Sequence, residues 1–330
     1  MIAWQVTEHG PVAEVLQLVR DVPGPEPTGD EVVVQVGACA LNFADSLLCA
    51  GTYQEHPPLP FTPGLEVAGV VVAAGPDATH RVGDRVAGSP SLPRGGLAEQ
   101  ALARSAHVFR LDDDVDDATA AAMHVTYQTA WFALQRRVEL RADDTLLVHA
   151  GAGGVGSAAV ELGLAVGATV IATAGGPEKV AGVAARGVTR AIDYRSEDFV
   201  AIVNELTDGR GADVIFDSVN GETFTRSTKC IAWEGSIVVI GAAGGTYVEA
   251  RTNHALVKNY GVLGLNWRGY LEHRPQLVAD AHRQLTRLLR TGALHPDISE
   301  RLPLDGDIPD ALARLVRGKT TGKLVVLPTG

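Results

Sequence analysis

The stretch Thr145-Leu-Leu-Val-His-Ala-Gly-Ala-Gly-Gly-Val-Gly156 joins a short apolar run to three glycines in the spacing G-x-G-x-x-G. Small and apolar residues follow over 157–166 and are typical of a helix. A strand, a glycine-rich turn and a helix in this order form the context that a dinucleotide-binding fingerprint needs. The glycines allow a tight turn and a close approach to a pyrophosphate, and the helix start offers free N–H groups to its phosphates. The stretch therefore predicts nucleotide binding.

Residues 145 to about 266 alternate predicted strands with predicted helices. The strands are expected at Thr145–Ala150, Thr169–Ala174, Arg190–Asp193, Asp213–Asp217, Ser236–Ile240 and Gly261–Leu265. The helices are expected near 157–166, 177–186, 196–207 and 221–232. This alternation is typical of βαβ crossovers, which build a doubly wound parallel sheet. The predicted fold class is therefore α/β, with a parallel Rossmann sheet in this part of the chain.

The chain before this region has a different pattern. Residues 1 to about 120 are expected to be mostly β, because β-branched runs such as Glu31–Val36 and Val67–Ala73 are bounded by turn residues. A helical pattern then begins near Ala118 and continues to Leu134. This first part therefore predicts a second, mostly β domain.

The alternation also ends after Trp267. The elements expected there are a helix near 275–290, a short helix near 308–317 and a final strand at 323–327. The simplest interpretation is that this tail returns to the first domain. We therefore expect a dinucleotide-binding domain over 123–267 and a catalytic domain formed by 1–122 with 268–330.

Composition narrows the class of partner. The chain has 330 residues, which is longer than a domain built around a single hydrophobic core usually is. Its formal net charge is −11, from 28 basic and 39 acidic side chains. An acidic balance disfavours nucleic acid or an anionic membrane as the main partner. Three cysteines without a C-x-x-C pair suit a reducing compartment, and no secretion signal or membrane span is evident. The sequence predicts a soluble cytoplasmic protein with a small-molecule substrate.

Several motifs are specific in both residue type and order. They are Leu41-Asn-Phe-Ala-Asp-Ser46, Ala50-Gly-Thr-Tyr53, Pro63-Gly-Leu-Glu-Val-Ala-Gly69, Val82-Gly-Asp-Arg-Val86, Thr129-Ala130 and the turn from Ala150 to Gly156. With them the chain resembles, nearly end to end, the zinc-free quinone oxidoreductase branch of the medium-chain dehydrogenases/reductases. The resemblance implies a GroES-like catalytic domain beside the Rossmann domain, and a homodimer.

The zinc branch of that family carries a Cys-His pair three residues before the motif's Asp, and Gly-His-Glu after its Pro. This chain has Asn42-Phe43 before Asp45, and Gly64-Leu65-Glu66 after Pro63. A catalytic zinc takes three protein ligands of the Cys, His or acid type, and two of those positions are an amide and a leucine here. Three scattered cysteines also cannot form the branch's four-cysteine site. We therefore expect no metal.

The cofactor is predicted from the end of the second Rossmann strand. An NAD site usually has an acid there, whereas this strand ends in Ala174-Gly175-Gly176. Lys179 and Tyr194 lie nearby in the predicted fold, and the resemblance implies that matching residues bind the 2′-phosphate of NADPH. Each could instead be an ordinary surface residue. The full set of expected cofactor-binding residues is Thr129, Ala152, Gly153, Gly154, Val155, Gly156, Gly175, Lys179, Tyr194, Gly241 and Asn266.

Two residues are candidates for the catalytic role. Without a metal Lewis acid, a hydride acceptor must be polarised by its own conjugation, as a quinone or an enone is. Asn42 replaces a metal ligand and has an amide N–H to donate, while Tyr53 is the best local proton donor. The alternatives are a turn residue for Asn42 and a wall residue for Tyr53. Asp45 is interpreted as structural or as a hydrogen-bond acceptor.

Three functions stay open at this point. The first is an NADPH-dependent quinone reductase. The second is an NADPH-dependent reductase of an α,β-unsaturated carbonyl, such as a 2-alkenal or an enoyl thioester, which shares the hydride step. The third is an NADPH-binding structural or RNA-binding protein, which the acidic balance and the Asn42 and Tyr53 pocket disfavour.

Overall fold

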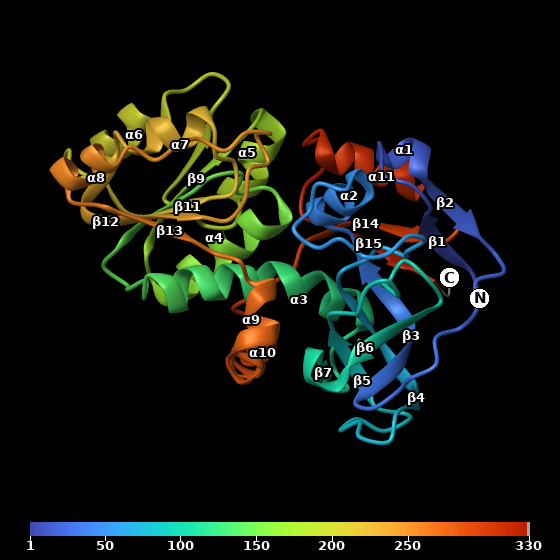
Figure 1. Cartoon of the computed structure of the whole chain (residues 1–330). Coiled ribbons are helices and arrows are strands. Elements are labelled where there is room, and N and C mark those ends of the chain that lie inside the picture. Colours follow the sequence, from blue (N-terminus) through green and yellow to red (C-terminus); the bar gives the residue numbers. More distant parts are fainter. Residues whose placement is uncertain (329–330) are drawn as a thin grey trace. The chain divides into compact units, whose positions relative to one another are not determined.

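The computed structural model describes residues 1–328 and divides into two compact units (Figure 1). Unit 1 contains Met1–Val125, His273–His282 and the chain from Pro296 onward. Unit 2 contains Thr126–Glu272 and Arg283–His295. Both units are therefore discontinuous in sequence, and three of the four points where the chain passes from one unit to the other lie inside helices, at 125/126, 272/273 and 282/283. The functional domain boundaries expected from the sequence stay a prediction.

Unit 2 is built on a six-stranded parallel sheet, in the order β10-β9-β8-β11-β12-β13. Its strands are β8 (Thr145–Val148), β9 (Thr169–Ala174), β10 (Arg190–Asp193), β11 (Ala212–Asp217), β12 (Ile231–Val239) and β13 (Gly261–Gly264). Strands of such sheets are continuous apolar runs because both faces are covered, and all four residues of β8 are buried. The strand order reverses between β8 and β11. Ligands bind at the carboxyl ends of the strands at such a reversal.

Helices flank this sheet on both faces (Figure 1). They are α4 (Gly154–Val166), α5 (Pro177–Ala184), α6 (Phe199–Leu206), α7 (Glu222–Ser227) and α8 (Thr252–Lys258). Leu146 meets α4, where a Cβ at Gly163 would lie 2.6 Å from its Cδ2, whereas Leu147 packs in a core with Phe199 and Phe224. Successive residues of β8 thus point to opposite faces, as a strand requires. The predicted doubly wound Rossmann sheet is confirmed.

One boundary in unit 2 differs from the prediction by several residues. A helix was expected over 221–232, but α7 ends at Ser227 and β12 begins at Ile231. The Cys230 carbonyl accepts a hydrogen bond from Ala212 N at 2.8 Å, so this segment joins the sheet. Pairing with β11 therefore overrides the local helical pattern.

Unit 1 is mostly β. Its larger sheet has the order β14-β15-β3-β4-β5-β7, and β6 pairs with β3; β1 and β2 form a separate pair. The strands are β1 (Ala3–Val6), β2 (Leu16–Val19), β3 (Glu31–Ala40), β4 (Val67–Ala74), β5 (Arg85–Gly88), β6 (Gln100–Arg104), β7 (Val108–Arg110), β14 (Ile298–Pro303) and β15 (Lys323–Leu327). The C-terminal strand β15 lies antiparallel to β3, with Val325 opposite Ala40. The strand β15 thus lies beside residues from the first 50 of the chain.

The remaining helices connect or cover these sheets. They are α1 (Val12–Val15), α2 (Phe43–Ala50), α3 (Asp117–Trp131), α9 (Arg268–His273), α10 (Pro275–Arg290) and α11 (Ile308–Val316), and a π-helical turn at Phe132–Arg137 follows α3. The helix α2 was not predicted, although it begins inside the Leu41–Ser46 motif. Within residues 1–328 every helix is too short or too polar to cross a bilayer.

Candidate functional site

The glycine turn of unit 2 lies at the carboxyl end of β8, where the strand order reverses. A Cβ at Gly156 would lie 2.2 Å from the Ala150 carbonyl oxygen, so only glycine fits. Ala150 itself has a φ of 54°. Gly153 is the N-cap of α4, and its position supplies no side-chain hydrogen bond to the helix start. The first N–H groups of α4 are therefore available to an anion, and the turn fits a pyrophosphate.

A second cluster surrounds the end of β9. A Cβ at Gly175 would lie 2.6 Å from the Tyr194 hydroxyl, and one at Gly176 would lie 3.1 Å from the Arg195 guanidinium. Burial lowers the pKa of Lys179, and the positive charge of Arg195 lowers it further. Lys179, Tyr194 and Arg195 thus gather around the β9 turn. The cluster offers two cations and a hydroxyl to an anionic group.

Sequence reasoning singled out Lys179 and Tyr194 but not Arg195. Arg195 could have been recognised from the sequence, because it directly follows Tyr194 at the end of the strand that neighbours β9. Acids also lie near this turn. The negative charge of Glu178 acts against the lowering of the Lys179 pKa. Asp193 accepts hydrogen bonds from Gly176 N at 3.0 Å and from Arg195 N at 3.1 Å. These two bonds hold the turn and lower the pKa of Asp193, the Gly176 bond most.

The other expected cofactor residues also lie in unit 2. Gly241 follows β12 and Asn266 follows β13, at the same carboxyl edge as the glycine turn because the strands are parallel. Asn266 accepts a hydrogen bond from Gly269 N at 3.2 Å. Thr129 is half-buried on α3. Their contact with a cofactor stays a prediction.

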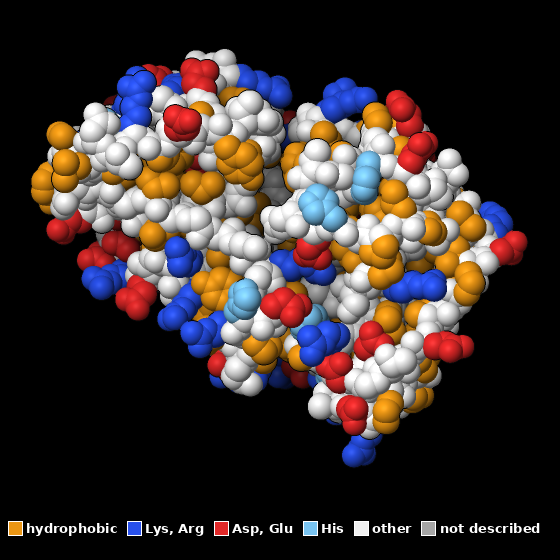
Figure 2. Space-filling view, in the orientation of Figure 1, with side chains coloured by type: hydrophobic (Ala, Val, Ile, Leu, Met, Phe, Trp, Pro, Cys, Tyr) orange, Lys and Arg blue, Asp and Glu red, His pale blue; other side chains and the backbone are white. Residues whose placement is uncertain are grey.

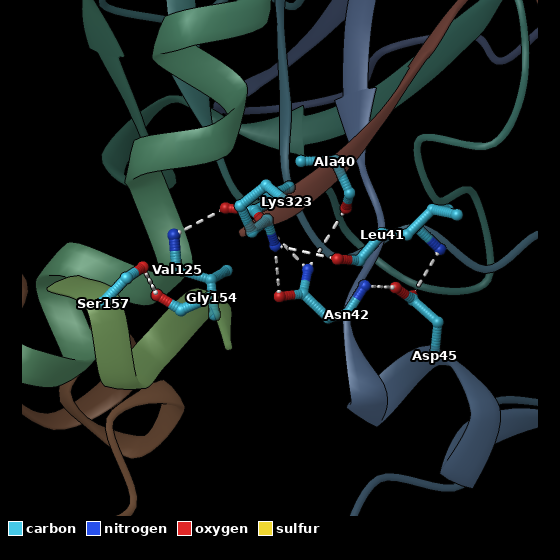
Figure 3. A network of polar contacts seen from close by, with 10 residues as sticks. Ala40, Leu41, Asn42, Asp45, Val125, Gly154, Ser157 and Lys323 are labelled. Carbon is cyan, nitrogen blue, oxygen red and sulfur yellow. Dashed lines mark hydrogen bonds and ion pairs between the residues drawn. The ribbon is translucent and has the colours of Figure 1, made fainter. Parts of the chain in front are cut away.

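In unit 1, Asn42 lies between β3 and α2 and is buried (Figure 3). Its Oδ1 accepts a hydrogen bond from Lys323 Nζ at 2.8 Å. Its Nδ2 donates to Glu66 Oε1 at 2.8 Å and to the Ala40 carbonyl at 3.2 Å. A lysine can only donate, so this contact fixes which end of the amide is the oxygen. Both amide hydrogens of Asn42 therefore already have acceptors inside the protein.

Lys323 and Glu66 form a buried ion pair. Lys323 Nζ lies 2.6 Å from Glu66 Oε1, and their side chains are 5% and 0% exposed. The second oxygen of Glu66 accepts a hydrogen bond from Val125 N of α3 at 2.6 Å. Sequence reasoning gave neither residue a role. The one signal for Lys323 was a charged residue opening the otherwise apolar strand Lys-Leu-Val-Val-Leu.

Asp45 holds the start of α2. Its Oδ2 accepts a hydrogen bond from Asn42 N at 2.8 Å, and its Oδ1 accepts one from Gly64 N at 2.9 Å. Burial raises its pKa to about 6, against the lowering effect of these two bonds. The geometry is that of a capping carboxylate, and it agrees with the structural role expected for Asp45.

Tyr53 follows the other end of α2. Gly51 ends the helix with a φ of 68°, and Tyr53 N then donates to the Leu47 carbonyl at 3.2 Å. The Tyr53 ring is half-buried against the apolar core of unit 1. One short helix thus carries both candidate catalytic residues, Asn42 before its start and Tyr53 after its end.

At the positions where the zinc branch of the family has its metal ligands, this chain has residues that pack in the core or contact a lysine. Leu65 is 3% exposed and belongs to the apolar core of unit 1. Asn42 and Glu66 both contact the Lys323 ammonium, which repels a second cation. Across residues 1–328, His, Cys, Asp and Glu form no group of three or more that could hold a metal ion.

Known proteins share this architecture. The family "Alcohol dehydrogenase GroES-like domain" matches residues 28–113, and the family "Zinc-binding dehydrogenase" matches residues 154–283, a range whose one cysteine is Cys230. A "Quinone oxidoreductase-like protein 2 homolog" from Nematostella vectensis is 38% identical over 90% of this chain and 81% of its own length. The GroES-like assignment of unit 1 is thus confirmed.

Solved structures agree over nearly the whole length. A quinone oxidoreductase of Pseudomonas syringae pv. tomato DC3000 is 33% identical, with a TM-score of 0.92 and 99% of each chain covered. The Escherichia coli quinone oxidoreductase, solved as a complex with NADPH, is 29% identical with the same TM-score, covering 99% of this chain and 100% of its own. This chain therefore belongs to the quinone oxidoreductase branch of the medium-chain dehydrogenase/reductase superfamily.

Proposed function

We propose that this protein is a zinc-independent oxidoreductase that transfers hydride from NADPH to a conjugated acceptor, first of all a quinone. The observation that carries the proposal is the pairing of a pyrophosphate-sized glycine turn with the Lys179, Tyr194 and Arg195 cluster in unit 2. The E. coli relative, crystallised with NADPH, supports the same cofactor. When bound, NADPH supplies the hydride.

Unit 2 has the task of holding the nucleotide. The uncapped start of α4 would face the pyrophosphate, and the Lys179, Tyr194 and Arg195 cluster would face the 2′-phosphate. NADH lacks that phosphate, so it would make no charge-assisted contact with the two cations at the β9 turn. This difference favours NADPH over NADH.

Unit 1 has the task of stabilising the acceptor. A quinone gains negative charge on oxygen as hydride arrives, and oriented hydrogen-bond donors stabilise that charge. Asn42 would offer its amide N–H and Tyr53 its hydroxyl. Asn42 must give up one internal bond to do so, and the bond to Ala40 is the longer of the two at 3.2 Å. Lys323 beside Glu66 supports the expectation that no zinc is needed.

The proposal is tested by assaying the purified protein against a panel of quinones, 2-alkenals and enoyl thioesters at fixed NADPH, and again at fixed NADH. We expect the largest kcat/KM for a quinone with NADPH. Turnover confined to alkenals or enoyl thioesters would move the function to the second candidate. Turnover abolished by a chelator and restored by zinc would contradict zinc independence. Salt-sensitive RNA retention without turnover would support the non-enzyme alternative.

We also propose that the protein is a homodimer that pairs through the β13 edge of unit 2. β13 is the last strand of its sheet, and the nearby side chains of Trp233, Leu256 and Val257 are 68%, 80% and 75% exposed. Figure 2 shows apolar side chains gathered over α8 at the left of the view. An unpaired strand edge beside apolar surface suits a second copy of the same chain. Sedimentation should give twice the 34.6 kDa chain mass, and a Val257→Glu variant should sediment as a monomer.

A cytoplasmic location belongs to the same proposal. Cys39, Cys49 and Cys230 are buried and free. Free cysteines suit a reducing compartment. Cell fractionation with the full chain tests this location, and recovery in a secreted fraction would contradict it.

A further inference from the structure

The Lys323 ammonium has three hydrogens and three acceptors. It donates to the Leu41 carbonyl at 2.8 Å, to Asn42 Oδ1 at 2.8 Å and to Glu66 Oε1 at 2.6 Å (Figure 3). A lysine ammonium carries no further donor. Because all three hydrogens are used and the side chain is buried, Lys323 cannot itself contact an acceptor molecule. Any effect of this cation on the reaction must pass through one of its three neighbours.

Asn42 is the neighbour placed to transmit that effect. Its carbonyl oxygen is held by Lys323, its backbone N by Asp45 Oδ2 at 2.8 Å, and one amide hydrogen by Glu66. A cation on an amide oxygen draws electron density from the nitrogen and strengthens its N–H donors. The second amide hydrogen meets the Ala40 carbonyl at 3.2 Å, which is the longest bond of the set. That hydrogen is the one a developing oxyanion can take over most easily.

We propose that Lys323 is a positioning residue for acceptor reduction, acting on the acceptor oxygen through the Asn42 amide. Lys323 keeps the Asn42 oxygen turned inward, so the nitrogen remains the donor, and it polarises that donor. Glu66 balances the buried charge and holds the other amide hydrogen. The inference rests on the proposed function, because it assigns a residue to the same reduction.

A purely structural role is the competing explanation. β15 is anchored to β3 and α2 through the Leu324 carbonyl, which accepts from Leu41 N at 2.9 Å, and through the Lys323 bonds. Loss of Lys323 would then lower stability and leave the turnover of the folded protein unchanged. The two explanations differ in whether the effect on kcat depends on Asn42.

The test is a double-mutant cycle on kcat between Lys323→Met and Asn42→Ala in the full chain. Quinone reduction is measured at saturating NADPH, and each kcat is divided by the concentration of NADPH-binding sites from calorimetry. We expect Lys323→Met to lower kcat about tenfold, as loss of a positioned donor does. In the Asn42→Ala background the same substitution should lower kcat less than twofold. The dissociation constant for NADPH should stay within twofold, because unit 2 is untouched.

Two further variants keep the test decisive. Val326→Ala removes packing from a fully buried residue of the same strand without touching Asn42, so it should lower stability and leave kcat per site unchanged. If Lys323→Met does not fold, Lys323→Gln retains an amide donor without the charge and should show the same dependence on Asn42.

Three results would overturn the inference alone, in an otherwise active protein. They are an unchanged kcat per site in the Lys323 variant, an equal loss in both backgrounds, and an equal loss in Val326→Ala. A wild-type chain that reduces no acceptor with NADPH would instead overturn the proposed function first, and this inference with it.

Discussion

Unit 2 presents mostly main-chain groups and nearby side chains at its candidate site, whereas unit 1 presents side chains from distant parts of the sequence. The glycine turn occupies residues 150–156, and the Tyr194 cluster completes it within about 45 residues. In unit 1, Asn42 depends on Glu66, 24 residues away, and on Lys323, 281 residues away. The comparison teaches that a site for a common cofactor is fixed by local backbone geometry. A site for a particular acceptor is assembled by the whole fold.

The two units also bury groups that titrate in opposite directions, and this difference predicts the largest effect. His149 in unit 2 contacts the hydroxyls of Thr173 and Ser227 at 3.1 and 2.9 Å, and burial lowers its pKa to about 3. As pH falls below 6.5, the His149 imidazole takes up a proton in the unfolded chain but not yet in the folded one. The stabilisation of the folded state that is present above pH 6.5 is therefore lost as pH falls toward 3. The loss reaches about 5 kcal/mol at its limit.

Asp45 in unit 1 behaves in the reverse sense. Its folded pKa of about 6 lies above the ordinary 3.8, so its contribution is present below about pH 4 and lost as pH rises through 6. That loss is about 3 kcal/mol. Denaturant unfolding of the wild type, His149→Gln and Asp45→Asn between pH 3 and 8 measures both terms. If the free energy of unfolding changed with pH in the same way in a variant as in the wild type, the pKa shift assigned to the substituted side chain would be contradicted.

The second prediction breaks the local geometry of unit 2. Gly156→Ala would place a Cβ 2.2 Å from the Ala150 carbonyl, so the turn must open. We expect NADPH affinity to fall at least about 100-fold, or ~2.7 kcal/mol. Gly182→Ala is the matched control, because a Cβ there meets nothing within 4 Å. Calorimetry measures both, and an undiminished affinity in Gly156→Ala would remove the turn from the binding site.

The same contrast explains what the sequence could predict. In unit 2, β9 and β10 lie at their expected residues, and β8, β11 and β13 differ by one or two, because buried parallel strands have local apolar signatures. The helix predicted over 221–232 was too long because its last residues pair with β11 as the start of β12. Such pairing cannot be detected in a local sequence pattern. Arg195 was not singled out, although its neighbour Tyr194 was.

Less of the candidate site in unit 1 could be predicted. Asn42 and Asp45 were singled out, and Asp45 has the structural place expected of it. Lys323 was not singled out, because the partners of its ammonium group, Leu41, Asn42 and Glu66, are 257 or more residues away in sequence. Its partners became visible only when β15 was paired with β3. Long-range pairing of this kind is set by tertiary packing and leaves no local period to detect.

The third prediction sharpens the assignment of the cofactor. Loss of a charge-assisted hydrogen bond costs about 1.5–3 kcal/mol, so Lys179→Ala and Arg195→Ala should each lower kcat/KM for NADPH about 10- to 100-fold. The value for NADH should change less than threefold. Lys229→Ala, at an exposed lysine of the same unit, is the charge-matched control. Equal losses with both nucleotides would show that these cations support the fold and do not select the phosphate.

The fourth and smallest effect is expected in unit 1, because the proposed mechanism divides stabilisation of the acceptor oxygen between Asn42 and Tyr53. Tyr53→Phe removes only a hydroxyl and should lower kcat about tenfold, near 1.4 kcal/mol, if that hydroxyl donates to the acceptor oxygen. The NADPH dissociation constant should not change, because the residues proposed to bind the nucleotide lie in unit 2. Tyr247→Phe removes the same group from a side chain that is 74% exposed and should change neither quantity. A raised KM at constant kcat would instead indicate that Tyr53 binds the acceptor equally before and during the reaction. Unit 1 would then serve to hold the acceptor, and the search for the proton donor would move to solvent.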